Sequence, residues 1–348
     1  MMPEEWPIAA LPAERGAMTR RPGRGRLDTV RRDLFLDENE RLTEQERALM
    51  KAMLACIVAE IADDIRASLP DGWGAANDPD NDVLLARLRR ARLLDIEPLV
   101  ALLLRRAEEE SALAAAQARP HRREARLLNS LVSHDNGPVA AAAMSLVLAR
   151  GKRRDPLGQC LIAADDLDPA TLVQLAQSVA AAMRAGVADR YGVAAADEAL
   201  GEAVDRLVRR QTREASSDAL MLELVALLDS AGRLDDAFLI AAAGEGEIAL
   251  LAHGLARRAG VEPAIAADSL VSGDPAQIMA LLRMGGASRE LAANLIAGSG
   301  DLLTLADSGQ AIEQFDQMPA ATVDVARAWM RSADGYRAAL ARLERDDG

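Results

Sequence analysis

The sequence contains very few aromatic residues. Of its 348 residues only three are Trp, two are Tyr and three are Phe, although 50% of the chain is hydrophobic. A chain of this length can bury a sizeable core, and that core must be built mainly from Ala, Leu, Val, Ile and Met. The shortage of aromatic side chains also disfavours the stacking platforms that bind bases of single-stranded nucleic acids.

Cysteine and histidine are equally scarce. Cys56 and Cys160 lie far apart without a CxxC partner, which excludes a disulfide framework and a zinc knuckle. Both follow apolar helical patterns, so we expect inert thiols in the core. The three histidines, His121, His134 and His253, lack the spacing of a metal centre, and no glycine-rich nucleotide loop is present. The sequence therefore indicates no cofactor.

Long apolar runs are missing as well. No window approaches the roughly 18 uninterrupted apolar residues that a membrane helix needs. The acidic start at residues 1–6 and the prolines Pro7 and Pro12 differ from a secretory signal. We expect a cytoplasmic protein without a membrane segment.

The chain is acidic and almost free of lysine. Only Lys51 and Lys152 are lysines among its 41 basic residues, and the formal net charge is −13. This charge disfavours non-specific binding of nucleic acid. Residues 1–155 contain 25 basic and 25 acidic side chains, whereas residues 156–348 contain 16 and 29, so the excess negative charge lies in the C-terminal part.

Composition divides the chain into three expected regions. Residues 1–38 are rich in Arg, Pro and Gly and are expected to form a flexible tail, which serves either as a solvated leader or as an arm for an acidic partner, RNA or DNA. Residues 39–155 form an N-terminal helical region with a long helix. Residues 156–348 form an acidic C-terminal helical-repeat region.

A long helix is expected to begin near residue 43. Thr43 and Glu46 have the spacing of a capping box, and apolar residues recur every three or four positions from Leu49 to Leu69. A helix with so wide an apolar stripe needs a partner, which is either the following helices of its own chain or the same helix of a second subunit. The candidate residues for self-association in such a homodimer are Met53, Ile57 and Ile61.

Prolines and glycines mark further helix boundaries. Expected starts are Glu97-Pro98, Gly137-Pro138, Asp155-Pro156, Asp168-Pro169, Glu262-Pro263 and Asp274-Pro275. Expected ends are Gly232, Gly244, Gly260, Gly273, Gly285 and Gly298. This spacing predicts an all-α fold in which the long N-terminal helix is followed by a HEAT-like α-solenoid of short antiparallel helices. A compact irregular helical domain is the alternative.

Several polar motifs could carry chemistry, but each has a simpler interpretation. His134 loosely resembles the phosphate-accepting histidine of histidine kinases, yet it precedes a helix start and is expected in a turn. His121 and Glu124 lack a second pair of metal ligands, and His253 is expected to be packed. The acidic pairs at 63–64, 165–166 and 235–236 and the acidic run at 108–110 are expected to be helix caps or solvated faces.

Arginine clusters give residues 80–155 a net charge of +4, from 14 basic and 10 acidic side chains. Such clusters could form a cationic groove for an acidic peptide, a nucleic acid or a nucleotide, or they could pair with neighbouring acids. The candidate anion or partner surface consists of Arg87, Arg89, Arg90, Arg122, Arg123 and Arg126.

Several segments resemble the bacterial family called domain of unknown function 2336. They are Asp33-Leu34-Phe35, residues 42–47, Ile65-Arg66, residues 94–99, and the run from Gly273-Asp274-Pro275 to Ser288-Arg289. The resemblance covers most of the chain beyond the tail, with a departure at residues 99–119. It implies an all-helical, HEAT-like protein of the bacterial cytoplasm, and it implies no particular activity.

The expected function is a non-enzymatic helical-repeat scaffold or adaptor that binds another protein in the bacterial cytoplasm, in a signalling role. A solenoid offers an extended surface, and the sequence offers no converging catalytic set. Two alternatives stay open: a regulatory module that contacts nucleic acid through the Arg clusters, and an enzyme of unrecognised type.

Overall fold

The structure is a computed structural model of the chain. It describes residues 42–73, 80–118, 127–156, 158–211, 215–271, 275–298 and 308–333, with single positions between 336 and 343. The chain divides into two units, Met1–Thr43 and Glu44–Gly348, and the helices below belong to the second. The predicted tail and Arg122, Arg123 and Arg126 lie outside the described residues.

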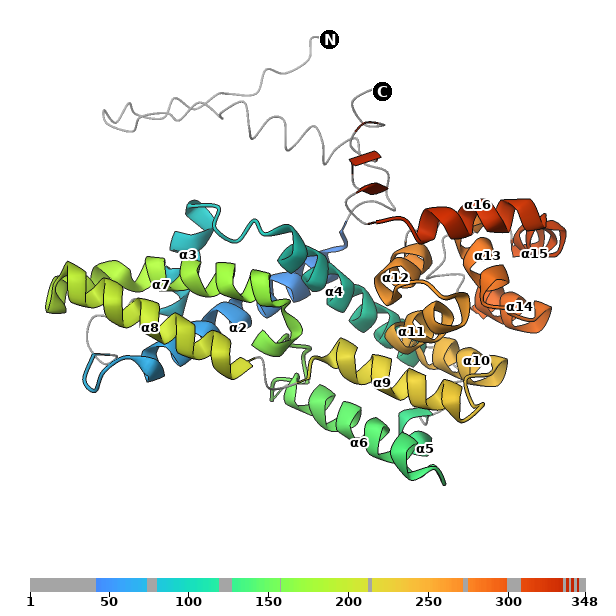
Figure 1. Cartoon of the computed structure of the whole chain (residues 1–348), viewed down its shortest axis with the longest axis horizontal. Coiled ribbons are helices and arrows are strands. Elements are labelled where there is room, and N and C mark those ends of the chain that lie inside the picture. The colour runs from blue at the N-terminus through green and yellow to red at the C-terminus, as the bar shows by residue number, and fades with distance from the viewer. Residues whose placement is uncertain are drawn as a thin grey trace, which may run out of the picture. The chain divides into compact units, whose positions relative to one another are not determined.

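The regular secondary structure of the described residues is helical, which confirms the all-α prediction (Figure 1). They contain fifteen α-helices, one 3-10 helix and no β-strand apart from an isolated bridge between Arg154 and Cys160. The first eight elements are α2 (Glu44–Ser68), α3 (Asn81–Arg90), α4 (Glu97–Ala118), α5 (Leu127–Val132), α6 (Gly137–Lys152), η2 (Ala164–Asp166), α7 (Pro169–Tyr191) and α8 (Val193–Gln211). The others are α9 (Ser217–Ser230), α10 (Asp236–Glu245), α11 (Ile248–Ala259), α12 (Pro263–Val271), α13 (Pro275–Met284), α14 (Arg289–Gly298), α15 (Ser308–Gln317) and α16 (Ala320–Met330).

Helices begin at most of the positions that the prolines predicted as starts. At α7, the Asp168 carboxylate accepts hydrogen bonds from the backbone N–H groups of Ala170 and Thr171, at 3.0 Å each. At α6, the Asn136 side chain accepts a bond from Val139 N–H at 3.3 Å. Such caps satisfy amides that have no partner within the helix.

Two predicted boundaries are wrong. No helix begins at Asp155-Pro156, because Asp155 accepts a hydrogen bond from Gln159 N–H at 2.8 Å and closes a tight turn instead. Helix α10 continues past Gly244 and ends at Glu245, and Gly246 takes the left-handed conformation with φ +76°. Only glycine adopts this conformation without a steric penalty, so the stop falls two residues later than predicted.

Buried apolar side chains form two hydrophobic clusters. The first cluster joins α2, α3, the first half of α4, η2, α7 and α8. The second cluster joins α5, α6 and α9 through α16. The first cluster therefore contains segments from both sides of residue 155. The division of the chain at that residue stays a prediction.

The residues proposed for self-association lie in the first cluster. Met53, Ile57 and Ile61 on α2 are each 0% exposed. Helix α2 packs against α4, α7 and α8 of its own chain, which supply the cover that its apolar stripe requires. A homodimer through these residues would require those helices to move away, and it stays a prediction.

Helix α11 lies at the centre of the second cluster. Every residue from Ala249 to Ala256 is buried, and the helix contacts α9, α10, α12 and α13. A helix that is covered on all sides can be apolar around its whole circumference.

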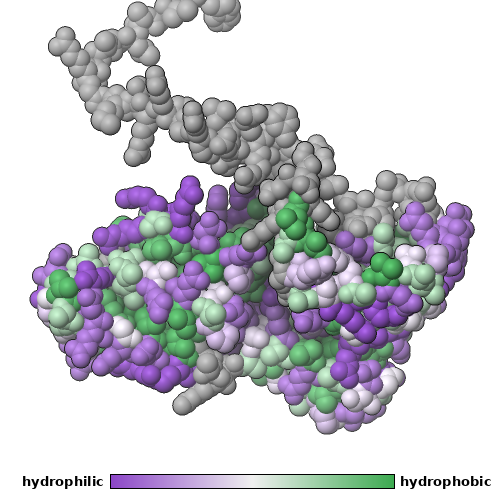
Figure 2. All heavy atoms as spheres, turned by 45° about the horizontal axis from the view of Figure 1, so that its top comes forward, coloured by the Kyte–Doolittle hydropathy of each residue, from purple (hydrophilic) through white to green (hydrophobic). Residues whose placement is uncertain are grey.

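On the face drawn in Figure 2, hydrophobic residues are mixed with hydrophilic ones.

Helix α4 connects the two clusters. It packs on α2 and also contacts α10 and α11 (Figure 1). The approach at its C-terminal half is close, because a Cβ atom added at Gly246 would lie 2.7 Å from the carbonyl oxygen of Ala112 and 2.9 Å from the Cβ of Ala116.

We expect Gly246→Ala to destabilise the protein more than Gly232→Ala. Both glycines have positive φ, +76° and +65°, so both variants introduce backbone strain of about 1–2 kcal/mol. Only position 246 adds a clash with α4, worth about 1–3 kcal/mol more. Urea unfolding of the two variants measures this difference, and equal losses of unfolding free energy would contradict the close packing of α4.

Candidate functional site

A buried arginine joins α4 to α9. Arg106 is 6% exposed, and its guanidinium donates to Asp218 Oδ1 and to Glu109 Oε2, at 2.7 Å each. The neighbouring Arg105 donates to the other oxygen of Asp218 at 2.7 Å. Both oxygens of Asp218 are thus held by α4. Loss of the buried Arg106 charge is expected to cost up to about 3–5 kcal/mol, because Glu109 and Asp218 would each lose a bonded partner.

A buried carboxylate on η2 bonds the first residue of α9. The side chain of Asp166 is 1% exposed and accepts hydrogen bonds from Arg153 Nε at 2.6 Å, Ser217 N–H at 3.0 Å and Ala163 N–H at 3.1 Å. Burial raises the pKa of Asp166. The hydrogen bonds and the charges of Arg153 and Arg106 lower it by more, so the pKa lies below its usual value. We call Arg105, Arg106, Glu109, Arg153, Asp166 and Asp218 the ion network.

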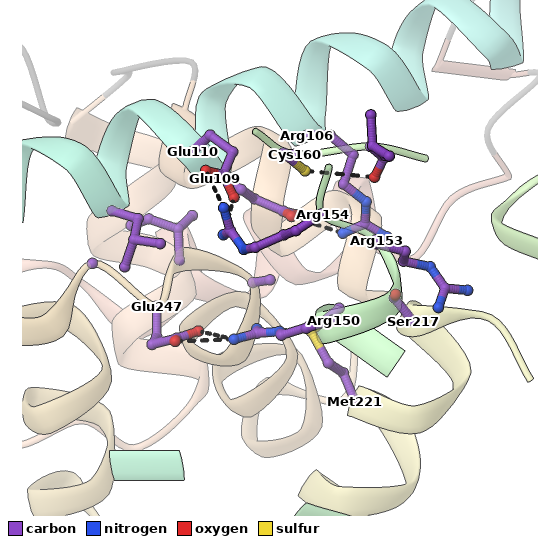
Figure 3. A pocket seen from close by; sticks show the side chains of 15 residues that line it. Arg106, Glu109, Glu110, Arg150, Arg153, Arg154, Cys160, Ser217, Met221 and Glu247 are labelled. Carbon is purple, nitrogen blue, oxygen red and sulfur yellow. Dashed lines mark hydrogen bonds and ion pairs between the residues drawn. The ribbon is translucent and has the colours of Figure 1, made fainter. Parts of the chain in front are cut away.

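A cleft opens beside the ion network (Figure 3). Its cavity volume is about 80 Å³. Arg154 donates to Glu110 on α4 at 2.6 Å, and Arg150 donates to both oxygens of Glu247 at 2.8 and 3.0 Å. Figure 3 shows these two ion pairs as separate bridges in the cleft. Arg150 and Arg154 in the cleft are therefore bonded to carboxylates of neighbouring segments.

The two cysteines differ in their surroundings. Cys160 lines the cleft, and burial, together with the charge of Glu110, raises the pKa of its thiol to about 12. At neutral pH this thiol stays protonated. Cys56 is exposed, which corrects the expectation that it lies in the core. On α2 it is adjacent to the core-facing Ile57, and successive helix residues point about 100° apart.

The described histidines are structural. His253 is buried in α11, and its Nδ1 lies 2.8 Å from the carbonyl oxygen of Ala249. Burial lowers its pKa despite this contact and the charges of Asp218 and Glu109, so the ring is neutral at pH 7. His134 lies in the turn before α6, as predicted, and its Nδ1 accepts a hydrogen bond from Asn136 N–H at 3.0 Å. His121 and Glu124 lie outside the described residues.

The acidic residues were only partly predictable. Asp235 caps α10 by accepting from Phe238 N–H at 2.9 Å, as expected. The acidic run at 108–110 is not a solvated face, because all three side chains are partly buried and two of them bond arginines, as described above. Burial raises the pKa of Glu108 to about 7, and the charges of Glu46 and Asp268 act in the same direction.

The arginines of α3 differ from those of the cleft. Arg87, Arg89 and Arg90 are exposed, as is Arg92 directly after the helix. Arg87 donates to the carbonyl oxygen of Ala182 at 3.0 Å. Arg89, Arg90 and Arg92 form no ion pair with any carboxylate of the described residues. The three predicted surface arginines that the structure describes therefore lie together on one short helix.

Two more open depressions, of about 350 and about 420 Å³, lie beside α2. No group of three His, Cys, Asp or Glu side chains in the described ranges has the arrangement of a metal site. None of the described helices is long and apolar enough to cross a bilayer.

The described chain is thus an all-helical protein in which several buried charges are bonded to one another. A family model matches residues 110–328, which is more than half of the sequence. The chain belongs to this family, described as uncharacterised proteins conserved in bacteria (DUF2336), which confirms the resemblance seen in the sequence. The match includes the similar run at residues 273–289, whereas the similar segments before residue 100 precede it. No curated protein and no solved structure matched.

We expect Glu108→Gln to change the pH dependence of stability between pH 5 and pH 8. Because the folded pKa of about 7 exceeds the usual value of about 4.3, the folded protein binds this proton before the unfolded chain does. The contribution of Glu108 therefore raises stability as the pH falls from 8 to 5. The variant should be more stable than wild type at pH 8, and the difference should shrink with falling pH.

Chemical denaturation at several pH values measures this effect, with the exposed Glu223→Gln on α9 as control. Below about pH 4 both proteins should lose stability, because Asp166 and Asp218 have lowered pKa values in the fold and must be protonated. Parallel curves for wild type and Glu108→Gln from pH 5 to pH 8 would contradict the raised pKa of Glu108.

Proposed function

We propose that this protein is a non-enzymatic, HEAT-like helical scaffold of the bacterial cytoplasm that binds an acidic segment of another protein. The observation that carries the proposal is the exposed arginine group on α3, which has no carboxylate partner among the described residues. The packing of the helices and the state of the cleft support it.

The contacts of α9 through α16 resemble those of a helical repeat. Neighbours along the chain contact each other, as α10 and α11 or α14 and α15 do. Alternate helices also contact each other: α9 with α11, α11 with α13 and α13 with α15. Repeat proteins stack in this way and present extended binding surfaces. The contact between α10 and α14 departs from a simple repeat and gives the second cluster a more closed arrangement.

The cleft supports a scaffold rather than an enzyme. A catalytic carboxylate or arginine must be able to reach a substrate, whereas Arg150 and Arg154 are bonded to Glu247 and Glu110. The thiol of Cys160, with its pKa of about 12, is a poor nucleophile. These charges are used to hold helices together.

The α3 surface consists of Val83, Arg87, Arg89, Arg90, Arg92 and Leu93, all of them exposed. Val83, Arg87 and Arg90 recur at intervals of four and three, which places them on one side of the helix. An exposed surface that combines guanidinium groups with apolar side chains fits a peptide that carries both carboxylates and apolar residues. The net charge of −13 and the shortness of α3 favour a protein segment over a nucleic acid.

We expect the charge reversal Arg90→Glu to weaken partner binding at least tenfold. Loss of one charge at a desolvated pair costs more than the roughly 1.4 kcal/mol that corresponds to tenfold in affinity. Affinity capture from the native host, followed by quantitative mass spectrometry, identifies proteins that wild type retains and the variant loses. Binding of the identified partner to both proteins is then measured by calorimetry.

The matched control is Arg233→Glu, which reverses an exposed arginine in the turn between α9 and α10. It should retain the partner at wild-type affinity. Equal binding by wild type and Arg90→Glu would exclude the α3 surface. If wild type instead binds single-stranded DNA or RNA with a steep salt dependence that Arg90→Glu abolishes, the nucleic-acid alternative replaces this proposal.

A further inference from the structure

Helix α6 has an outward face without charge. Among the 16 residues of Gly137–Lys152 only Arg150 and Lys152 are charged. Arg150 bonds Glu247, and Lys152 is the last residue of the helix. The exposed side chains between the two ends are Ala141, Met144, Ser145 and Leu148.

The opposite side of α6 is fully buried. Val139, Ala143 and Leu146 are each 0% exposed and belong to the second cluster. On the outward face, Met144 is 43% and Leu148 is 61% exposed. A helix that is apolar around its whole circumference is typical of a buried helix, so the exposed face of α6 indicates that something covers it.

The two ends of this face carry opposite charges. Asp135 lies directly before the N-cap Asn136, and Lys152 ends the helix. Both are exposed, and neither forms an ion pair or a side-chain hydrogen bond with any described residue. They are separated by about 26 Å along the helix at 1.5 Å per residue.

We propose that α6 pairs antiparallel with α6 of a second copy of this chain. An antiparallel arrangement about a two-fold axis places Lys152 of each copy near Asp135 of the other. Opposite charges at the two ends and none between them make the face complementary to itself. This interface differs from the α3 surface and does not depend on the proposed partner.

The side chains of the face fit this pairing in size. With the two-fold axis between Met144 and Ser145, each Leu148 lies opposite Ala141 of the other copy, and each Met144 lies opposite Ser145. Large side chains then face small ones, as close helix packing requires. Copies with a net charge of −13 repel one another on average, so an uncharged face is the most favourable place for contact.

The first test measures molecular mass in solution. We expect wild type to approach twice 37.0 kDa with rising concentration in sedimentation equilibrium, with a dissociation constant in the micromolar range. Leu148→Glu should return the mass to that of one chain, because the two copies would bring like charges onto one apolar interface. Val193→Glu on α8 is the matched control, since Val193 is 55% exposed, and it should behave as wild type.

The second test distinguishes this pairing from other dimers. Lys152→Glu and Asp135→Lys should each weaken association, and the double variant should restore it, because the exchange keeps opposite charges at the two ends of the antiparallel pair. Circular dichroism confirms that each variant is folded. A mass of 37.0 kDa for wild type at about 200 µM, or a dimer that Leu148→Glu leaves intact, would overturn the proposal.

Discussion

The arrangement of the described helices depends on one buried charge. Arg106 is enclosed between α4 and α9, and it would be strongly destabilising without Asp218 and Glu109. Because Asp218 reaches Arg106 only when the two helices meet, the ion network fixes one relative placement of α4 and α9. Helix α4 also contacts both hydrophobic clusters, so this single constraint links the packing of the first cluster to that of the second.

The pairing of arginines with carboxylates also explains where binding is expected. In the cleft, arginines and carboxylates neutralise one another, and this leaves little unbalanced charge for a ligand. Two places depart from this pattern: α3 has arginines without carboxylate partners in the described part of the chain, and α6 has an outward face without charge. An apolar and a cationic surface on one helical framework suit a protein that joins other chains, its own copies included.

The sequence predicted local features well and distant partners poorly. Proline and cap signals located the starts of α4, α6, α7 and α12, because capping involves neighbouring residues. The roles of Asp166 and Glu109 were missed, since an acidic pair or run does not reveal which arginine or amide will reach it in the fold. For the same reason, the apolar stripe of α2 did not reveal whether helices of the same chain or a second copy cover it. In the structure, Met53 and Ile57 are buried within one chain.

Hydrogen exchange of wild type and Arg106→Met tests most directly whether the ion network couples the two hydrophobic clusters. If the ion network couples the clusters, amides of α7 in the first cluster and α11 in the second open with the same free energy in wild type. In Arg106→Met the two helices should open with different free energies, while Arg184→Met, which breaks an exposed pair with Asp197, should leave them equal. Separate opening of α7 and α11 in wild type, or unchanged coupling in Arg106→Met, would contradict this account.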